Sequence, residues 1–281
     1  MPATVSGAPP GAPVALKRGA ARQRRVTSRR LGDVLTTLAL PIAGFVLVIG
    51  LWQLAITVFD IPEFMLPSPG KVLHTLWTER DQLWFHAKRT TLGFTIGFFL
   101  AALSGVPLAT LLAFSRVASG LLYPVIIATQ SMPKSALAPL FLVWLGFGLK
   151  SEVGIAFLIA IFPVLINTMA GLRALPTQLL YLGKSMGGTR LRIFTKVRLP
   201  YALPSIFAGL KVAITLAIIG AVVGEFVGSN AGLGYLIVST SVNMNTPLAF
   251  AALVCLGVLS MVSFAAVEVV GRRVCGGREG A

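Results

Sequence analysis

Residues 181–200 read YLGKSMGGTRLRIFTKVRLP, and the chain continues to Lys211 as YALPSIFAGLK. Residues 181–200 hold five basic residues and no acidic one, and a charge-free apolar run, Val153–Leu172, precedes them. Basic loops between membrane spans usually face the cytoplasm. Twenty residues are more than a turn needs, so we predict a structured cytoplasmic loop that binds a partner.

Local chemistry predicts where helices end and begin in this loop. A short helix over Leu179–Met186 is expected to end at Gly187 and Gly188, because glycine adopts the left-handed conformation at low cost. Thr189 is expected to cap a second short helix, Arg190–Val197. The two glycines would then form a bend between two short helices.

Two prolines follow the second helix. Pro200 and Pro204 are expected to stop it and to start the next span, because proline lacks an N–H group and restricts the residue before it. The predicted result is a rigid bend on the inner face of the membrane.

The composition is that of a membrane protein: 56% of the 281 residues are hydrophobic and 12% are charged. The net charge of +15 could indicate nucleic-acid binding. However, the basic residues gather before Leu31, between Arg173 and Arg198, and after Gly271, which one topology places in the cytoplasm. We therefore interpret the charge as a topology signal and expect no nucleic-acid partner.

The apolar runs predict an all-α membrane protein with six spans and both termini in the cytoplasm. Residues 1–33 are expected to be a disordered basic tail, 34–89 the first span with a periplasmic interfacial segment, 90–271 the core with the loop at 173–204, and 272–281 a tail. The predicted spans are Val34–Phe59, Thr90–Phe114, about Leu121–Leu145, Val153–Leu172, about Ser205–Gly228 and about Pro247–Val270.

Two further segments are expected on the outer side. Val72–Phe85 places apolar residues at helical spacing and predicts an interfacial helix. Ser229–Thr246 is expected to be an outer loop. His74 and His86 lie near the first of these segments without an acid or cysteine at metal-ligand spacing, so both are interpreted as surface histidines and no metal site is predicted.

The third span is predicted to be irregular, because three prolines interrupt it and Lys134 lies near its middle. A cation at mid-span costs about 2.5–3.5 kcal/mol, so it usually faces a partner or a polar path. We hypothesise that Lys134, with Gln130, Ser131 and Glu225, lines a translocation path and favours an anion. In the alternative, the span is broken and Lys134 reaches the interface or pairs with Glu225.

Gly220, Gly224, Gly228 and Gly232 recur every four residues. On a helix they would form one stripe where another backbone can approach closely. Packing within the chain and a dimer face both fit this pattern.

Catalysis and nucleotide binding by this chain are not expected. The sequence offers no catalytic Ser/His/Asp set, and we expect no carboxylate pair within the membrane. Gly183-Lys184-Ser185 looks like the end of a phosphate-binding loop, but Gln178 occupies the place of its first glycine and no strand precedes it. The two cysteines, Cys255 and Cys275, do not suggest a disulfide framework.

The basic loop resembles the coupling loop of ATP-binding-cassette (ABC) importer permeases. That motif is Glu-Ala-Ala, three residues, Gly, nine residues, Ile, one residue and Leu-Pro. Gly187, Val197, Leu199 and Pro200 occupy the matching positions, whereas Tyr181, Leu182 and Gly183 replace Glu-Ala-Ala, so the acid is missing. The resemblance implies that the loop docks on an ATPase subunit, through a surface that also includes Lys184, Ser185, Gly188 and Arg190.

Three other stretches resemble the nitrate, sulfonate and taurine branch of this family: Leu66–Val72, Pro133–Gly148 and Glu225–Ile237. The resemblance covers most of the chain from about Leu66 to Val270. It implies the fold of a type I importer permease in the bacterial inner membrane.

The same resemblance implies the partners and the mechanism. Two permease copies, as a homodimer, would work with two ATPase subunits that bind ATP and Mg, with a periplasmic solute-binding protein and with membrane lipid. The pair would import a small anion such as a sulfonate, taurine or nitrate by alternating access, without a cofactor in this chain. An ion-gradient-driven secondary transporter and a non-transporting membrane scaffold are the alternatives.

Overall fold

The computed structural model describes residue 40 and residues 42–276. The chain divides into two units, residues 1–60 and 61–281. In the first unit, Ile42–Val58 forms one apolar helix. The predicted tail at 1–33 and the start of the predicted span Val34–Phe59 lie outside the described residues.

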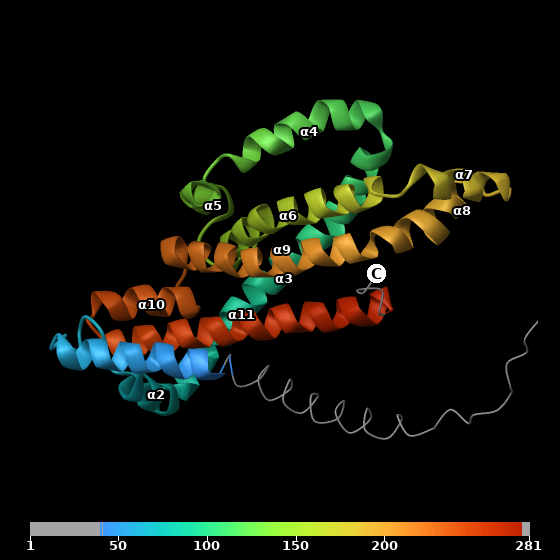
Figure 1. The fold of residues 1–281 in the computed structure, drawn as a ribbon. Coiled ribbons are helices and arrows are strands. Elements are labelled where there is room, and N and C mark those ends of the chain that lie inside the picture. The colour runs from blue at the N-terminus through green and yellow to red at the C-terminus, as the bar shows by residue number, and fades with distance from the viewer. Residues whose placement is uncertain (1–39, 41, 277–281) are drawn as a thin grey trace, which may run out of the picture. The chain divides into compact units, whose positions relative to one another are not determined.

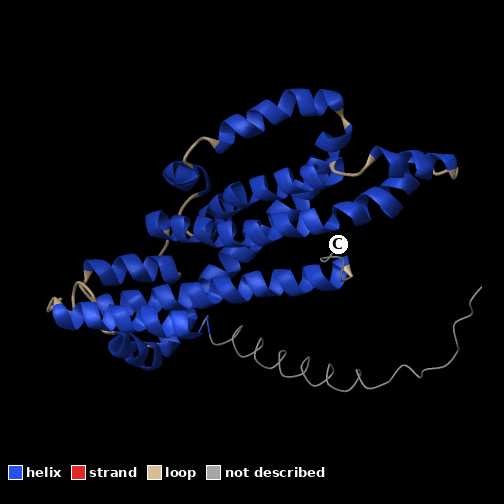
Figure 2. Cartoon of the chain, viewed as in Figure 1, coloured by secondary structure: helices blue, strands red, loops and turns tan. Residues whose placement is uncertain are grey.

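The second unit consists of helices joined by short connections, and no strand occurs in its described part, residues 61–276 (Figure 2). This confirms the all-α prediction for the described chain. Its helices are α2 (Pro69–Thr78), α3 (Arg80–Phe114), α4 (Arg116–Gln130), η1 (Lys134–Leu137), α5 (Ala138–Leu145), α6 (Leu149–Arg173), α7 (Thr177–Ser185), α8 (Arg190–Ile193), the π-helical segment η2 (Phe194–Arg198), α9 (Leu199–Gly228), α10 (Leu233–Val242) and α11 (Thr246–Cys275) (Figure 1).

Among the described residues, four helices are long and apolar enough to cross a membrane. They are α3, α6, the continuous helix Arg190–Gly228 that contains α9, and α11. The pair α4 and α5 adds a fifth if it counts as one broken span. The described helix Ile42–Val58 is shorter than the roughly 20 residues that a span needs. Six spans and cytoplasmic termini therefore stay a prediction.

The core of the second unit lies where α6 packs on α9, which runs alongside it in Figure 1, and on α3, which crosses both. Ala156 of α6 illustrates why these helices can approach so closely. A Cβ atom at Gly97 of α3 would lie 2.6 Å from the Ala156 Cβ, and one at Gly220 of α9 would lie 2.7 Å from its Cα. Small residues at a helix contact allow two backbones to meet, as is common in membrane proteins.

Alanine fills the rest of this core. Five further alanines of this core cluster have no exposed surface: Ala101, Ala160, Ala213, Ala217 and Ala221. Larger side chains, Phe94, Phe98, Val164, Ile214 and Ile218, close the gaps around them. The core therefore depends on close backbone approach more than on large interlocking side chains.

Four predicted boundaries were wrong. The interfacial helix is shorter than predicted, since α2 ends at Thr78 and α3 begins at Arg80, ten residues before the predicted span. The predicted outer loop contains the ten-residue helix α10. At the C-terminal end α11 continues to Cys275, so Arg272 and Arg273 lie in its last turn and not in a tail. Basic residues there interact favourably with the carbonyl end of a helix.

The predicted third span is broken, as its prolines indicated. Helices α4 and α5 meet at an angle of 91° across a break at Ser131–Pro133 and the short segment η1. The N–H groups that Pro133 and Pro139 lack would otherwise continue the helical hydrogen bonds, so the chain turns here. The break places Lys134 at a helix end instead of inside a regular span.

Candidate functional site

Helix α7 ends at a bend at Gly187, where two backbone N–H groups donate hydrogen bonds back to carbonyls of the helix. The Gly188 N–H donates to the Gly183 carbonyl at 3.0 Å, and the Gly187 N–H donates to the Lys184 carbonyl at 2.9 Å. This is the Schellman arrangement, which requires a left-handed residue after the helix. Gly187 is that residue, with φ of +73°. The predicted glycine ending is therefore confirmed, one residue earlier than expected because α7 ends at Ser185.

Thr189 begins the second helix as predicted. Its hydroxyl accepts a hydrogen bond from the Arg192 N–H at 3.3 Å, which satisfies one of the free donors of the first turn. Ile193 of this helix packs back on the bend, where a Cβ atom at Gly188 would lie 3.0 Å from its side chain. Ile193 thus packs against both Gly183 and Gly188 and holds the two short helices together.

The prediction that Pro200 and Pro204 stop this helix was wrong. The helix runs without a break from Arg190 to Gly228, and both prolines lie inside it. In a regular helix the ring of Pro200 would meet the carbonyl of Lys196, four residues earlier. Here Lys196 belongs to the widened π-helical segment η2, which removes that conflict. The bend is therefore directly continuous with α9.

The bend exposes apolar side chains between basic ones. Tyr181, Leu182, Met186 and Leu191 are each more than half exposed. Lys184, Ser185 and Arg190 are exposed beside them. Exposed apolar surface that polar residues border often marks a contact with another protein. Tyr181, which occupies the place of the missing acid, is 70% exposed.

The base of the bend is fixed to the junction of α3 and α4. Arg173 donates hydrogen bonds to the Leu112 carbonyl at 3.2 Å and to the Ser119 hydroxyl at 2.8 Å. The Phe194 ring meets the Phe114 ring edge-on with 5.3 Å between the ring centres, and the Arg198 guanidinium lies 4.7 Å from the centre of the Phe114 ring. A groove of about 220 Å³ lies between this junction and the bend.

Val197, Leu199 and Pro200, the other motif positions, lie where η2 joins α9 and are half-buried. They lie between the bend and the helical core, and not among the exposed residues of the bend itself. Leu199 packs on the cluster of Leu172, Ala202 and Ile206, where the C-terminal end of α6 meets the N-terminal end of α9. These positions therefore connect the bend to the core.

Three of the four residues predicted for a translocation path lie at the break between α4 and α5. Gln130 and Ser131 are exposed at the end of α4, and Lys134 follows them across the break. The Lys134 Nζ atom lies 4.5 Å from the centre of the Phe162 ring of α6. Glu225 is only 1% exposed and belongs to α9. No ion pair joins Lys134 to Glu225 in the described chain, and the shared path stays a prediction.

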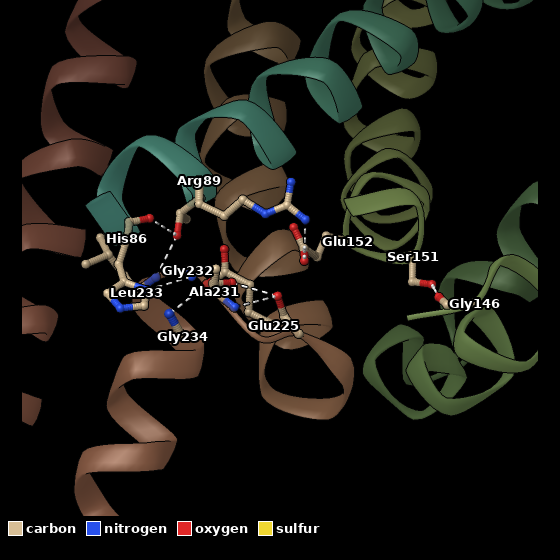
Figure 3. A network of polar contacts seen from close by, with 12 residues as sticks. His86, Arg89, Gly146, Ser151, Glu152, Glu225, Ala231, Gly232, Leu233 and Gly234 are labelled. Carbon is tan, nitrogen blue, oxygen red and sulfur yellow. Dashed lines mark hydrogen bonds and ion pairs between the residues drawn. The ribbon is translucent and has the colours of Figure 1, made fainter. Parts of the chain in front are cut away.

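Glu225 instead holds the start of α10 (Figure 3). Its Oε2 atom accepts a hydrogen bond from the Gly234 N–H at 2.7 Å. Two side chains of α3 bind the neighbouring donors: Thr90 Oγ1 accepts from the Leu233 N–H at 2.8 Å, and His86 Nδ1 accepts from the Gly232 N–H at 3.0 Å. The interpretation of His86 as a surface histidine was therefore wrong, whereas His74 is exposed as predicted.

A buried ion pair lies behind this attachment, as Figure 3 shows. Arg89 of α3 approaches Glu152 of α6, with 3.6 Å between Nη2 and Oε1. Glu152 has no exposed surface, and neither of its carboxylate oxygens has a hydrogen-bond partner in the described chain.

The glycine stripe of α9 packs within the chain. A Cβ atom at Gly224 would lie 2.8 Å from the Glu152 Cα atom, and one at Gly228 would overlap the Leu142 side chain. Gly220 meets α6 in the same way. Gly232 is not part of the stripe, because α9 ends at Gly228 and Gly232 has φ of +121°. These glycines therefore form the contacts of α9 with α6 and with α5.

A protein-family model described as the binding-protein-dependent transport system inner membrane component matches residues 105–275, more than half of the chain. The chain belongs to this family. The match begins in α3 and includes the bend, the broken α4–α5 pair and α11. The resemblance that the sequence motifs suggested is thereby confirmed, and the protein is a membrane permease of the ABC importer type.

Curated relatives agree with this assignment. A probable ABC transporter permease protein of Haemophilus influenzae is 40% identical over 81% of this permease and 92% of its own length. The formylaminopyrimidine transport permease of Halalkalibacterium halodurans is 32% identical over 81% and 91% of the two chains. The taurine transport system permease of Escherichia coli is 25% identical over 84% and 88%.

A solved structure supports the fold. The permease superposes on a chain of the methionine ABC transporter MetNI in an inward-facing conformation with a TM-score of 0.60. The match covers 69% of this permease and 98% of that chain at 22% identity. At this identity the likeness concerns the fold alone, and it confirms the predicted fold of a type I importer permease.

Proposed function

We propose that this permease is the transmembrane subunit of an ATP-driven importer, and that the bend formed by α7 and α8 is the docking surface of its ATPase. The observation that carries the proposal is the continuity of the bend with α9. A Schellman ending at Gly187 and a threonine cap at Thr189 fix a surface of exposed apolar and basic residues at the tip of a 39-residue helix. A rigid tip on a long helix is suited to transmit motion.

The mechanism follows from two attachments of the bend. Its tip begins the continuous helix Arg190–Gly228, which contains α9 and at about 1.5 Å per residue extends for about 58 Å. Its base is bonded to the α3–α4 junction through Arg173 and Phe114. When ATP closes the ATPase pair, movement of the bend shifts α9 together with α3 and α4. The path then alternates between inward-open and outward-open states, and hydrolysis resets it.

The proposal includes the partners of such an importer. ATP and Mg bind to the ATPase subunits, and this chain binds no cofactor. A second copy of the permease completes the path, a periplasmic solute-binding protein delivers the solute, and the assembly lies in the lipid of a bacterial inner membrane with both termini of this chain in the cytoplasm. The family description, which names binding-protein-dependent transport, supports these partners.

The proposed substrate is a small solute with an anionic group, of the sulfonate, taurine or nitrate class. Lys134 supports this choice, because its ammonium group lies at the broken α4–α5 segment, beside exposed polar Gln130 and Ser131. The taurine relative fits it, whereas the formylaminopyrimidine relative points to a heteroaromatic solute. Both classes therefore belong in the transport assay.

Co-purification of the permease with its ATPase tests the docking surface. Met186→Glu places a charge on a side chain that is 79% exposed at the bend. We expect it to reduce the captured ATPase by about tenfold, since a charge buried in an interface without a partner costs more than about 1 kcal/mol. Val242→Glu, on α10 with 77% exposure, is the matched control and is expected to retain the ATPase.

Equal capture by the two variants would contradict the assignment of the bend. Uptake into proteoliposomes provides the functional counterpart. We expect it to require internal ATP and the solute-binding protein, and to persist when ionophores remove the ion gradients. Uptake that instead collapses with the ion gradient would favour a secondary transporter.

A further inference from the structure

The start of α10 is held by side chains of other helices and not by its own. The first N–H groups of a helix have no partner within the helix. In α10 the acceptors for three consecutive donors, Gly232 to Gly234, are His86 and Thr90 of α3 and Glu225 of α9. We call these three side chains the α10 clamp. All three are at most 7% exposed, so water does not easily replace them.

His86 differs from the other two members in its chemistry. Its Nδ1 atom accepts the Gly232 N–H, which requires a lone pair and therefore an unprotonated Nδ1. Histidine is the side chain that gains a proton between about pH 5 and 8. A protonated imidazole would leave the buried Gly232 N–H without an acceptor. It would also place a positive charge at a helix N-terminus, where the helix dipole disfavours it.

Protons can reach His86 through a polar groove. A groove of about 410 Å³ lies between α3, α10 and the start of α11, and His86 forms part of its wall. Glu79, Gln82, Ser239 and Asn243 line it as well. The imidazole is thus buried on its Nδ1 side against Gly232 and borders a polar space on another side.

The charged and titratable groups around His86 come from several helices. Glu79 directly precedes α3 and Arg89 belongs to it, whereas Glu152 belongs to α6 and Glu225 to α9. Tyr235 of α10 contributes a ring whose centre is 6.0 Å from that of His86. The groove-lining residues at the start of α11, Asn245 and Leu248, do not titrate.

Glu225 makes the consequence of protonation larger. Gly232 lies directly against the Glu225 carboxylate, where a Cβ atom would overlap it. A positively charged His86 on the other side of Gly232 would attract that carboxylate away from the Gly234 N–H. Loss of one clamp bond therefore weakens a second one.

We infer that His86 is a positioning residue whose unprotonated Nδ1 keeps α10 attached to α3 and α9, and that acidification at the groove releases the start of α10. Because Glu225 lies near the outer end of α9, release would change how the end of this helix is held during transport. The inference depends on the proposed function only for the uptake assay and for the side that the groove faces.

Hydrogen exchange of the peptide spanning residues 229–242 tests the attachment directly, in the full permease purified with its ATPase. After correction for intrinsic exchange rates, we expect exchange in the wild type to rise by about tenfold between about pH 7.5 and 4.5, because a buried donor loses its acceptor once His86 gains a proton. His86→Asn places an amide oxygen near the position of Nδ1 and is expected to stay protected throughout. His86→Phe is expected to exchange fast at every pH.

The exposed His74 supplies the control, since His74→Asn is expected to follow the wild-type profile. A wild-type profile that does not change with pH, or one that His86→Asn reproduces, overturns the inference. If His86→Phe does not fold, the comparison of wild type with His86→Asn still decides. Protection of His86→Phe equal to that of the wild type also overturns it.

Uptake as a function of external pH separates this inference from the proposed function. We expect wild-type uptake to fall on acidification while uptake by His86→Asn stays constant. If no solute moves at any pH, the proposed function fails, and the exchange profiles still decide on the clamp. Equal pH profiles of uptake in the two proteins would contradict a role of the clamp in transport.

Discussion

The Nη2 atom of Arg89 lies 3.6 Å from the Oε1 atom of Glu152, and this acid is completely buried. Removing one partner of such a pair leaves an uncompensated charge, which costs about 3–5 kcal/mol when both are fully buried. Because the Arg89 side chain is 27% exposed, we expect Arg89→Met to lower the free energy of unfolding by less, about 2 kcal/mol.

The double variant Arg89→Met/Glu152→Met is expected to recover most of this loss, because it removes both charges. Thermal unfolding of the purified proteins in one detergent measures both effects. The half-exposed pair of Lys71 and Glu63, 2.8 Å apart, provides the control, and Lys71→Met is expected to change stability by less than about 1 kcal/mol. A double variant less stable than Arg89→Met would show that the pair is not the cause.

This pair also shows which part of the site the sequence could not reveal. The bend at Gly187 depends on neighbouring residues, so its glycines and Thr189 were predicted correctly from local chemistry. Arg89 and Glu152 lie 63 positions apart, and His86 bonds to a residue 146 positions later. Only the packing of α3 against α6 and α10 brings such residues together. A signal did exist for Glu152, an acid directly before a charge-free apolar run.

The prolines give the opposite lesson about local rules. Pro200 and Pro204 predicted the end of a helix, yet the helix continues through both. Membrane helices tolerate proline where neighbouring turns readjust, and the π-helical segment η2 is such a readjustment. The preference of proline for the end of a helix was thus overridden by the readjusted turn before Pro200.

Gly220 should be the glycine of α9 that tolerates a side chain least. A methyl group there would lie 2.7 Å from the Cα atom of Ala156, which is backbone and unable to rotate away. We expect Gly220→Ala to destabilise the permease by about 1–3 kcal/mol, as overpacking does. Gly257→Ala in α11, with no atom within 4 Å, is the control and should be neutral or stabilising by up to about 1 kcal/mol. Equal melting temperatures for the two variants would refute the close contact.

Gly187 should be sensitive for a different reason, since no atom lies within 4 Å of a Cβ atom at this position. Its φ of +73° is the constraint, and a β-branched residue in this conformation costs about 1–2 kcal/mol or more. We expect Gly187→Val to abolish ATP-driven uptake while the chain still inserts. Gly187→Asn, which tolerates this conformation, should retain most of the uptake. Wild-type uptake by Gly187→Val would count against transmission through the bend.

Lys134 provides the last test, because it decides between the two substrate classes. Its ammonium group lies 4.5 Å from the centre of the Phe162 ring, a contact that keeps the charge at the break between α4 and α5. If this charge attracts an anionic solute, Lys134→Gln should reduce uptake of a sulfonate by about tenfold and leave a neutral heteroaromatic solute unaffected. Lys134→Arg keeps the charge and should retain uptake of both. Lys150→Gln, at an exposed lysine of α6, should change neither. If Lys134→Gln takes up both solutes as well as the wild type does, Lys134 has no part in substrate selection. Its contact with Phe162 would then have a structural role only.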